Sequence, residues 1–309
     1  MTCARLVDSG ACWVCGGDRA TVYHDALFDL RAYERQDPEL SEYSGMSVHL
    51  RRCVECGFGQ PAQLPALPRF FDRMYDQLWS RGWIEQEFEA TYKDLIFRRI
   101  LGALRRRIPD GRRSLLDVGA HAGRFLDLAR AEGWAPEGIE LNPRTASYAA
   151  ARTGLPVHRL NVSDVASLGR DYDAVTMTDV LEHIPDPVAT LVRVRETLVP
   201  SGWIAVKVPC GPAQRFKESC RARLSATYRP RLADNLVHVN HFSPAALRLA
   251  LERAGFSAIS VEVGAPECPP IGKASNALRI VVYGLGRVVP FATHTPLALN
   301  LQAFARKAA

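Results

Sequence analysis

The sequence lacks long hydrophobic runs and any segment with the pattern of a signal peptide. No uncharged apolar stretch reaches the roughly 18 residues that a membrane-spanning helix needs. The most apolar late segment, residues 278–292, is interrupted by Arg279, Arg287 and Pro290. The first residues show no basic region followed by an apolar core. We therefore expect no membrane span and a cytoplasmic location.

Internal repeats and low-complexity segments are also absent, and the composition is that of an ordinary globular chain. The 309 residues, 47% hydrophobic and 23% charged, allow one large domain with a small one, or two modest domains. The net charge is +6, and arginines cluster between residues 98 and 113. A solvated helix face explains that cluster more simply than phosphate contacts do, so we expect no nucleic-acid partner.

Four of the eight cysteines form two closely spaced pairs near the N-terminus. Cys12 and Cys15 stand in CWVCGG, and Cys53 and Cys56 in CVECGFG. A glycine after the second cysteine permits the tight turn that aims two thiolates at one point, so the pairs predict a closed, structural zinc site. A redox dithiol or unligated pairs are the alternatives, and His24 or His49 could replace one thiolate. We expect the spacer, residues 16–52, to form a small sheet of its own.

A proline-rich connector, residues 61–68, precedes a segment with helical spacing of apolar residues. We expect residues 69–112 to form one or two helices that link the zinc module to the main domain and cover its cofactor. Tyr75, Trp79 and Tyr92 are candidates for the substrate entrance, although plain packing explains each of them more simply.

From residue 113 onward, strands and helices alternate. Strands are expected in SLLDV, APEGIEL, LPVHRL, YDAVTM, WIAVKVP, SAISVEV and LALNLQAFARK, with helices between most of them. Such alternation predicts an α/β fold with a doubly wound, seven-stranded, mostly parallel sheet. Ligands of such sheets bind at the carboxyl ends of the strands.

The turn after the first of these strands has the character of a cofactor loop. It contains Gly119 and Gly123, and Glu140 ends the next strand 21 residues after Gly119. An acid at that distance is placed to accept hydrogen bonds from ribose hydroxyls. A dinucleotide site would have glycine where His121 and Arg124 stand, so the loop favours a ligand without phosphates.

The segments LLDVGAHAGRFL, GIELNP, YDAVTMTDVLEHIPDP, LVPSGW and HVNHFSPAALRLALERAGF resemble successive motifs of class I S-adenosylmethionine-dependent methyltransferases. The resemblance covers roughly residues 113–309 and is closest to the small-molecule group with VLEH after the fourth strand. The paired cysteines resemble the zinc-binding segment of sugar C-methyltransferases and related natural-product enzymes. The division implied is a zinc-binding module at 1–68, a helical cap at 69–112, and a methyltransferase domain at 113–309 with insertions at 210–236 and 265–297.

The resemblance implies a cofactor site made from the strand ends. The loop beneath the methionine part is assigned to Gly119, Ala120 and Gly123, and Asp117 orders the loop or meets the amino group through water. His121 is expected to keep the loop's path, with its ring toward the cofactor's carboxylate end or outward. Glu140 is assigned to the ribose, and Thr178 to the methionine end. The adenine contacts are assigned to Leu141, Asn161 and Val162, with Asp164 as an alternative to Asn161.

Histidines are the candidates for the base that takes a proton from an acceptor hydroxyl. His183 comes first because it stands just beyond the fourth strand, and His238 and His241 follow. Glu182 is expected to be structural, and HFSP also predicts a helix start capped by Ser243. The apolar helix expected within 265–297 is taken first as a lid, with a dimer contact or membrane-surface patch as alternatives.

The most favoured activity is methylation of a hydroxyl on a small natural product, glycoside or sugar, with a small-molecule acceptor and no nucleic acid as partner. Self-association as a homodimer stays open. C- or N-methylation of a nucleotide-linked sugar is the alternative, since residues 210–236 are basic. Nucleic-acid methylation is less favoured because no N/D-P-P-Y/F motif follows the fourth strand. An inactive methyltransferase-like fold is disfavoured by the intact Gly119, Gly123 and Glu140.

Overall fold

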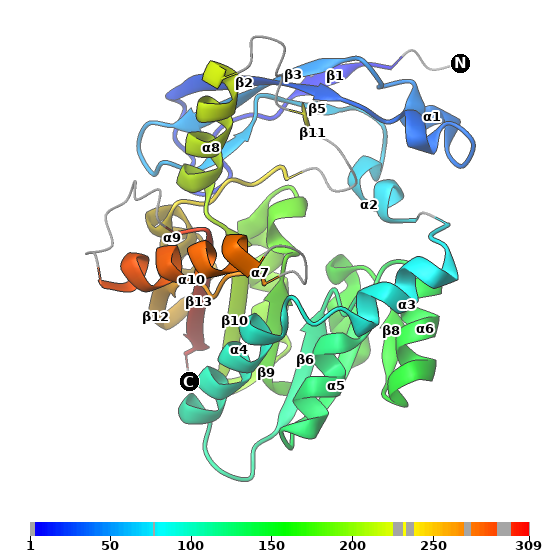
Figure 1. The fold of residues 1–309 in the computed structure, drawn as a ribbon, viewed down its shortest axis with the longest axis vertical. Coiled ribbons are helices and arrows are strands. Elements are labelled where there is room, and N and C mark those ends of the chain that lie inside the picture. Colours follow the sequence, from blue (N-terminus) through cyan, green and yellow to red (C-terminus); the bar gives the residue numbers. More distant parts are fainter. Residues whose placement is uncertain are drawn as a thin grey trace.

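The computed structural model describes residues 4–76, 78–224, 231–232, 238–268, 273–288 and 298–308. A small β-rich module, built from the N-terminal residues, sits against one end of a larger α/β domain (Figure 1). Short helices lie between the two parts.

The N-terminal module contains two sheets. The larger has the strand order β11-β2-β3-β4, and the smaller pairs β1 with β5. These strands are β1 (Leu6–Asp8), β2 (Ala20–Phe28), β3 (Ser47–Cys53), β4 (Gly59–Pro61), β5 (Gln63–Pro65) and β11 (Arg231–Leu232). The spacer between the cysteine pairs thus forms sheet, as expected, with η1 (Arg31–Tyr33) and α1 (Pro38–Ser41) beside it. Its core includes Phe28, Leu40 and Leu50.

Three helices follow the module: α2 (Phe70–Tyr75), α3 (Arg81–Glu89) and α4 (Asp94–Arg107). We expected one or two helices over residues 69–112, and the structure has three. The chain leaves helical geometry at Ala90, which is extended, and re-enters at Asp94. The break turns Tyr92 and Lys93 toward a cavity described below, so tertiary contacts override the local helical pattern.

The predicted seven-stranded sheet is confirmed, with the order β12-β13-β10-β9-β6-β7-β8. Its strands are β6 (Ser114–Val118), β7 (Ala135–Glu140), β8 (Val157–Arg159), β9 (Tyr172–Thr178), β10 (Leu198–Pro209), β12 (Phe256–Val263) and β13 (Asn300–Lys307). Only β13 runs antiparallel to its neighbours β10 and β12. The central strands β6 and β9 are buried along almost their whole length, which explains their continuous apolar runs.

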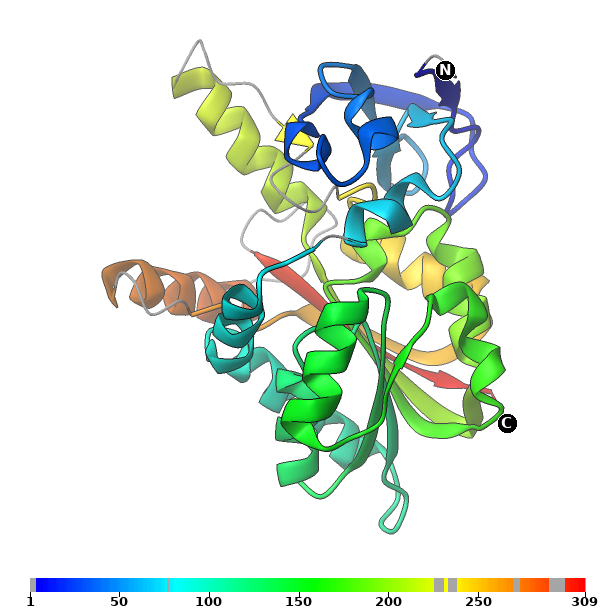
Figure 2. The same ribbon diagram turned by 90° about the vertical axis from the view of Figure 1, so that its right-hand side faces the viewer.

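Further helices connect the strands: α5 (Arg124–Ala131), α6 (Pro143–Thr153), α7 (Pro187–Glu196) and α9 (Pro244–Arg253), with short η2 (Val162–Leu168) and η3 (Leu181–His183). Two more, α8 (Gly211–Leu224) and α10 (Lys273–Val288), lie in the predicted insertions. Figure 2 shows both α8 and α10 projecting from the same side of the molecule. The expected cap is also found, since Ser243 accepts a hydrogen bond from the Ala246 backbone at the start of α9.

Candidate cofactor and acceptor site

A cavity of about 740 Å³ lies at the carboxyl ends of β6, β7 and β9. The helical segment from α2 to the start of α4 forms its other wall. Most of the predicted cofactor residues line it: Asp117, Gly119, Ala120, His121, Glu140, Leu141, Asn161, Val162 and Thr178. The volume is that of a small-molecule site, and the cavity stands where parallel sheets bind ligands.

The glycine loop owes its shape to packing on both sides. Gly119 has a φ of 78°, and a Cβ there would meet Val180 Cγ2 at 2.4 Å. Gly123 has a φ of 89°, and its Cβ would press on Ala149 and Thr153. Gly123 does not line the cavity; it lets α5 and α6 approach each other. The two glycines therefore allow the loop to pack closely against the turn after β9 and against α6.

Glu140 is held in place by the backbone around it. Its carboxylate accepts hydrogen bonds from the His121 N–H at 2.8 Å and from the Asn142 N–H at 2.9 Å. Burial raises the pKa of Glu140, and these two N–H donors oppose that rise. Each carboxylate oxygen keeps a further lone pair for a ligand hydroxyl, so the acid is preorganised at the cavity wall.

His121 packs inward and does not point to solvent. Its ring lies 5.5 Å from that of Trp83 and 6.0 Å from that of Trp79, both on the α3 side of the cavity. Burial lowers the pKa of His121 to about 4. Its φ of 50° is one that side chains rarely adopt. The residue therefore contributes its backbone N–H to Glu140 and a neutral ring to an aromatic wall.

A protein carrying His121→Asn should lose less stability than the parent protein when the pH is lowered. The pKa of the buried ring is below its ordinary value of 6.5, so the unfolded chain binds the proton first as pH falls. The stability from the neutral ring is complete above about pH 6.5 and is lost toward pH 4, a change of up to about 3 kcal/mol. Denaturant unfolding at several pH values would measure it. Identical pH dependence in both proteins would contradict the assignment, and cofactor affinity should change only modestly because Asn keeps the backbone donor.

Arg124 stands where a dinucleotide loop would carry a glycine, and it links the glycine loop to helix α4. Its guanidinium binds both carboxylate oxygens of Asp94, at 2.6 and 3.0 Å. Asp94 begins α4, so the ion pair fixes the helical segment across the cofactor loop. A bidentate pair of this kind adds direction as well as charge.

Asp117 and Asn161 have clear structural partners as well as cavity positions. Asp117 accepts a hydrogen bond from Thr176 Oγ1 at 2.6 Å, and burial raises its pKa to about 7. Asn161 caps η2 through the Ser163 N–H at 2.8 Å. Asp164, the alternative to Asn161, does not line the cavity.

His183 lines the cavity just beyond β9, and His238 lies directly behind it. The two ring centroids are 4.7 Å apart, and the ring of Tyr75 is 5.9 Å from His183 on another side. Burial lowers the pKa of His238 to about 4, so its ring is neutral at neutral pH. Gln214 of α8 contacts His238 Nδ1 at 3.1 Å.

Asn240 explains why these histidines meet. Its side-chain amide donates to the carbonyls of Leu181 and Ile184, both at 2.7 Å, and the Val239 and Asn240 N–H groups donate to the carbonyl of Glu182. These bonds join the segment after α8 to the turn after β9. Sequence reasoning did not single out Asn240, and only its place between two histidines could have suggested it.

His241 and Glu182 lie outside the cavity lining. His241 forms a β-bridge with Gly59 of the module, and its Nε2 contacts the His238 carbonyl at 3.0 Å. Burial lowers the pKa of His241 to about 3. Glu182 is buried, and burial raises the pKa of Glu182 well above its usual range. These positions suit packing between the two parts of the chain.

A buried ion network beside the cavity was missed by sequence reasoning. Asp179, which follows β9, pairs with Lys93 Nζ at 2.9 Å and with Lys207, and Lys207 also pairs with Glu267 at 3.3 Å. Burial favours a neutral Asp179, but the two ammonium groups outweigh it and hold the pKa of Asp179 below its usual range. Lys93 and Asp179 line the cavity. The only signal in the sequence was an acid at a strand end.

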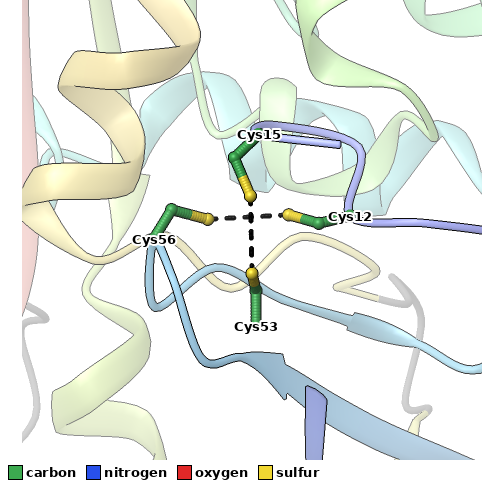
Figure 3. A group of neighbouring side chains, drawn as sticks. All are labelled: Cys12, Cys15, Cys53 and Cys56. Carbon is green, nitrogen blue, oxygen red and sulfur yellow. Dashed lines mark hydrogen bonds between the residues drawn. The ribbon is translucent and has the colours of Figure 1, made fainter. Parts of the chain in front are cut away.

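The four paired cysteines converge, as Figure 3 shows. Their sulfur atoms all lie within 4.8 Å of one another, and the Sγ pairs Cys12–Cys56 and Cys15–Cys53 are 3.5 and 3.4 Å apart. A tetrahedron with Zn–S bonds of about 2.3 Å has edges of roughly 3.8 Å, so the thiolates fit a zinc ion. A second group able to hold a metal, Glu182 with His183 and His238, also lies within 4.8 Å.

Known proteins share both sequence and fold with this chain. A ubiquinone biosynthesis O-methyltransferase of Paracidovorax citrulli is 28% identical over 138 residues, which cover 42% of this chain and 57% of that protein. The chain thus spans little more than half the length of the curated relatives it matches.

Solved structures extend the similarity to most of the chain. One, a complex between the Haloferax volcanii Trm112 methyltransferase activator and a putative methyltransferase, gives a TM-score of 0.51 at 17% identity, over 77% of this chain and 98% of that chain. The plantazolicin methyltransferase BpumL in complex with SAH gives 0.50 at 11% identity, over 77% and 94%. At these identities the likeness concerns the fold alone.

A family model described as a methyltransferase domain matches residues 65–261, which is more than half of the chain. The match begins before α2 and reaches into β12, so it includes the helices α2 to α4, the glycine loop, Glu140 and the turn after β9. The chain belongs to this methyltransferase-domain family, with the Rossmann-like fold of S-adenosylmethionine-dependent methyltransferases.

Proposed function

We propose that the protein transfers a methyl group from S-adenosylmethionine to a hydroxyl of a small natural product, glycoside or sugar. The observation that carries the proposal is one cavity lined by the glycine loop, by Glu140 and by His183. The O-methyltransferase name of the similar curated proteins supports oxygen as the methylated atom.

The residues present suit the cofactor. When bound, S-adenosylmethionine supplies an electrophilic methyl group on a sulfonium. Glu140, already fixed by two backbone donors, would accept the ribose hydroxyls, and Leu141, Asn161 and Val162 would lie beside the adenine. The loop from Gly119 to His121 would carry the methionine part.

His183 is the proposed base. The His183 ring would take the hydroxyl proton as the acceptor oxygen receives the methyl group that the cofactor supplies. His238 is a positioning residue behind it: its neutral ring puts no second positive charge beside His183. The aromatic wall of Trp79, Trp83 and His121 would limit the access of water on that side of the cavity.

We also propose that the four clustered cysteines hold one structural zinc ion, and that residues 1–68, 69–112 and 113–309 act as zinc module, helical cap and methyltransferase domain. The cap shares its packing with the module, because Phe70 and Met74 of α2 belong to the module's core while Phe71 and Tyr75 line the cavity.

Methylation at carbon or nitrogen of a nucleotide-linked sugar is the second candidate. It is favoured by the basic helix α8, which contacts His238 through Gln214 and carries Arg215 and Lys217. Incubation with radiolabelled S-adenosylmethionine and a panel of hydroxylated aromatics, glycosides and nucleotide sugars tests both. Label bound through oxygen supports the first candidate, and label on a sugar carbon or nitrogen supports the second.

Replacing Glu140 with Gln should weaken S-adenosylmethionine binding by about 10- to 100-fold, since the loss of charged hydrogen bonds costs about 1.5–3 kcal/mol. Isothermal titration calorimetry measures the change. Glu137→Gln is the matched control: Glu137 lies on the same strand but pairs with His158, Tyr172 and Arg170 away from the cavity. If the parent protein binds no S-adenosylmethionine, the methyl-transfer proposal fails.

A further inference from the structure

Helix α10 exposes an unusual amount of apolar surface. Leu278, Val281, Leu285 and Val288 are between 52% and 83% exposed, and Ile280 is 51% exposed. The first four follow helical spacing of three and four residues, so they lie on one face. That face carries no charged side chain, which reverses the usual polarity of a surface helix.

Arg279 and Arg287 lie on other sides of α10. Arg279 Nη1 donates to the Glu267 carbonyl at 3.2 Å, and the guanidinium groups of Arg99 and Arg287 approach the ring of Tyr283 at 5.6 and 5.8 Å. Tyr283 packs against the core of the domain. The helix is therefore anchored through its polar side and Tyr283, while its apolar face points away from the protein.

Helix α8 carries further exposed apolar and basic side chains on the same side of the molecule. The yellow-green α8 and the orange α10 project together in Figure 2. Phe216 and Leu224 of α8 are 59% and 87% exposed, and Lys217, Arg221 and Arg223 are exposed beside them. Among the side chains of the two helices that the structure describes, the basic ones are Arg215, Lys217, Arg221, Arg223, Arg279 and Arg287, and the only acid is Glu218.

This combination fits a surface that is both apolar and negatively charged. An amphipathic helix with apolar side chains on one face and basic residues at its flanks is typical of proteins that lie in the headgroup region of a bilayer. A second copy of the chain fits less well, because a two-fold contact would bring the same basic surface together. Among the helices that the structure describes, none is long and apolar enough to cross a membrane.

We propose that α8 and α10 bind an anionic lipid surface, with the apolar face of α10 lying in the plane of the interface. The inference goes beyond the proposed methyl transfer and does not depend on it. The described residues of α10 do not line the cavity, so the expected lid is not the arrangement seen here. However, the Cys268 N–H, shortly before α10, donates to the Tyr92 carbonyl at 2.8 Å, and Tyr92 lines the cavity. Membrane contact would bring the side of the cavity that contains Tyr92 close to lipophilic acceptors.

Co-sedimentation of the full chain with lipid vesicles tests the proposal. Binding is expected to vesicles of phosphatidylcholine with phosphatidylglycerol, and to be at least about tenfold weaker with phosphatidylcholine alone, because several basic residues contribute. Val281→Glu should reduce binding to the anionic vesicles by about tenfold or more. Arg221→Gln should reduce it less and should lower its dependence on phosphatidylglycerol.

Val7→Glu is the control, since Val7 is 39% exposed on β1, which Figure 2 places across the module from α8. Thermal unfolding verifies that each variant is folded. The proposal is overturned if the parent protein does not bind anionic vesicles, or if Val7→Glu reduces binding as much as Val281→Glu. It is also overturned if lipid-free protein forms a dimer that Val281→Glu abolishes, because a second copy would then cover α10.

Discussion

A protein carrying His183→Asn is expected to bind S-adenosylmethionine normally and to lose about two to four orders of magnitude in kcat, the usual contribution of a positioned base. The ring lies in the cavity wall after β9, whereas the residues proposed to hold adenosine follow β7 and β8. Steady-state kinetics with an accepted hydroxyl substrate would measure the loss, and calorimetry would verify cofactor binding.

The matched control is His158→Asn. His158 lies on β8, where its Nε2 contacts Glu137 at 3.3 Å, and it does not line the cavity. This variant should keep the parent's kcat. A loss of kcat of less than about threefold in His183→Asn would be far smaller than a base contributes. It would show that positioning and exclusion of water suffice for methyl transfer without a base. His238→Asn should give a smaller loss, because His238 acts through His183.

The sheet and the cofactor side of the cavity were predictable because both rest on local patterns. Strands of a parallel sheet are buried on both faces, so β6, β9 and β10 are evident as apolar runs. Their carboxyl ends meet at one edge, so residues such as Gly119, Glu140 and Thr178 could be assigned to one site from their order alone. The VLEH turn was recognised because it resembles a motif of class I S-adenosylmethionine-dependent methyltransferases.

The acceptor side was less predictable because it depends on contacts between distant segments. The meeting of His183 with His238 requires Asn240 to bind two carbonyls of the turn after β9. The pairing of Lys93 with Asp179 requires the break between α3 and α4 at Ala90, and the helical spacing did not give the position of such a break. From the sequence, His241 was as good a candidate for the base as His238. Its position against Gly59 depends on how the N-terminal module packs on the larger domain.

Loss of the proposed zinc is expected to inactivate the protein as well as to unfold the module. Zinc contributes roughly 10–16 kcal/mol to small four-ligand sites, as much as the whole stability of a typical domain. Cys53→Ser should therefore abolish the single bound zinc ion, lower the thermal midpoint sharply and remove methyl transfer. Elemental analysis, calorimetric unfolding and the activity assay measure the three effects.

Activity should fall because the module supports the acceptor side of the cavity. Phe58 packs on Phe242, Ser243 Oγ donates to the Cys56 carbonyl, and Gly59 pairs with His241, so the segment carrying His238 rests on the module. Cys220→Ser is the control, because Cys220 lies on α8 outside the cluster. It should change none of the three measurements. Full zinc content and an unchanged midpoint in Cys53→Ser would exclude the four-thiolate site, whereas retained activity after complete zinc loss would separate the module from the catalytic cavity.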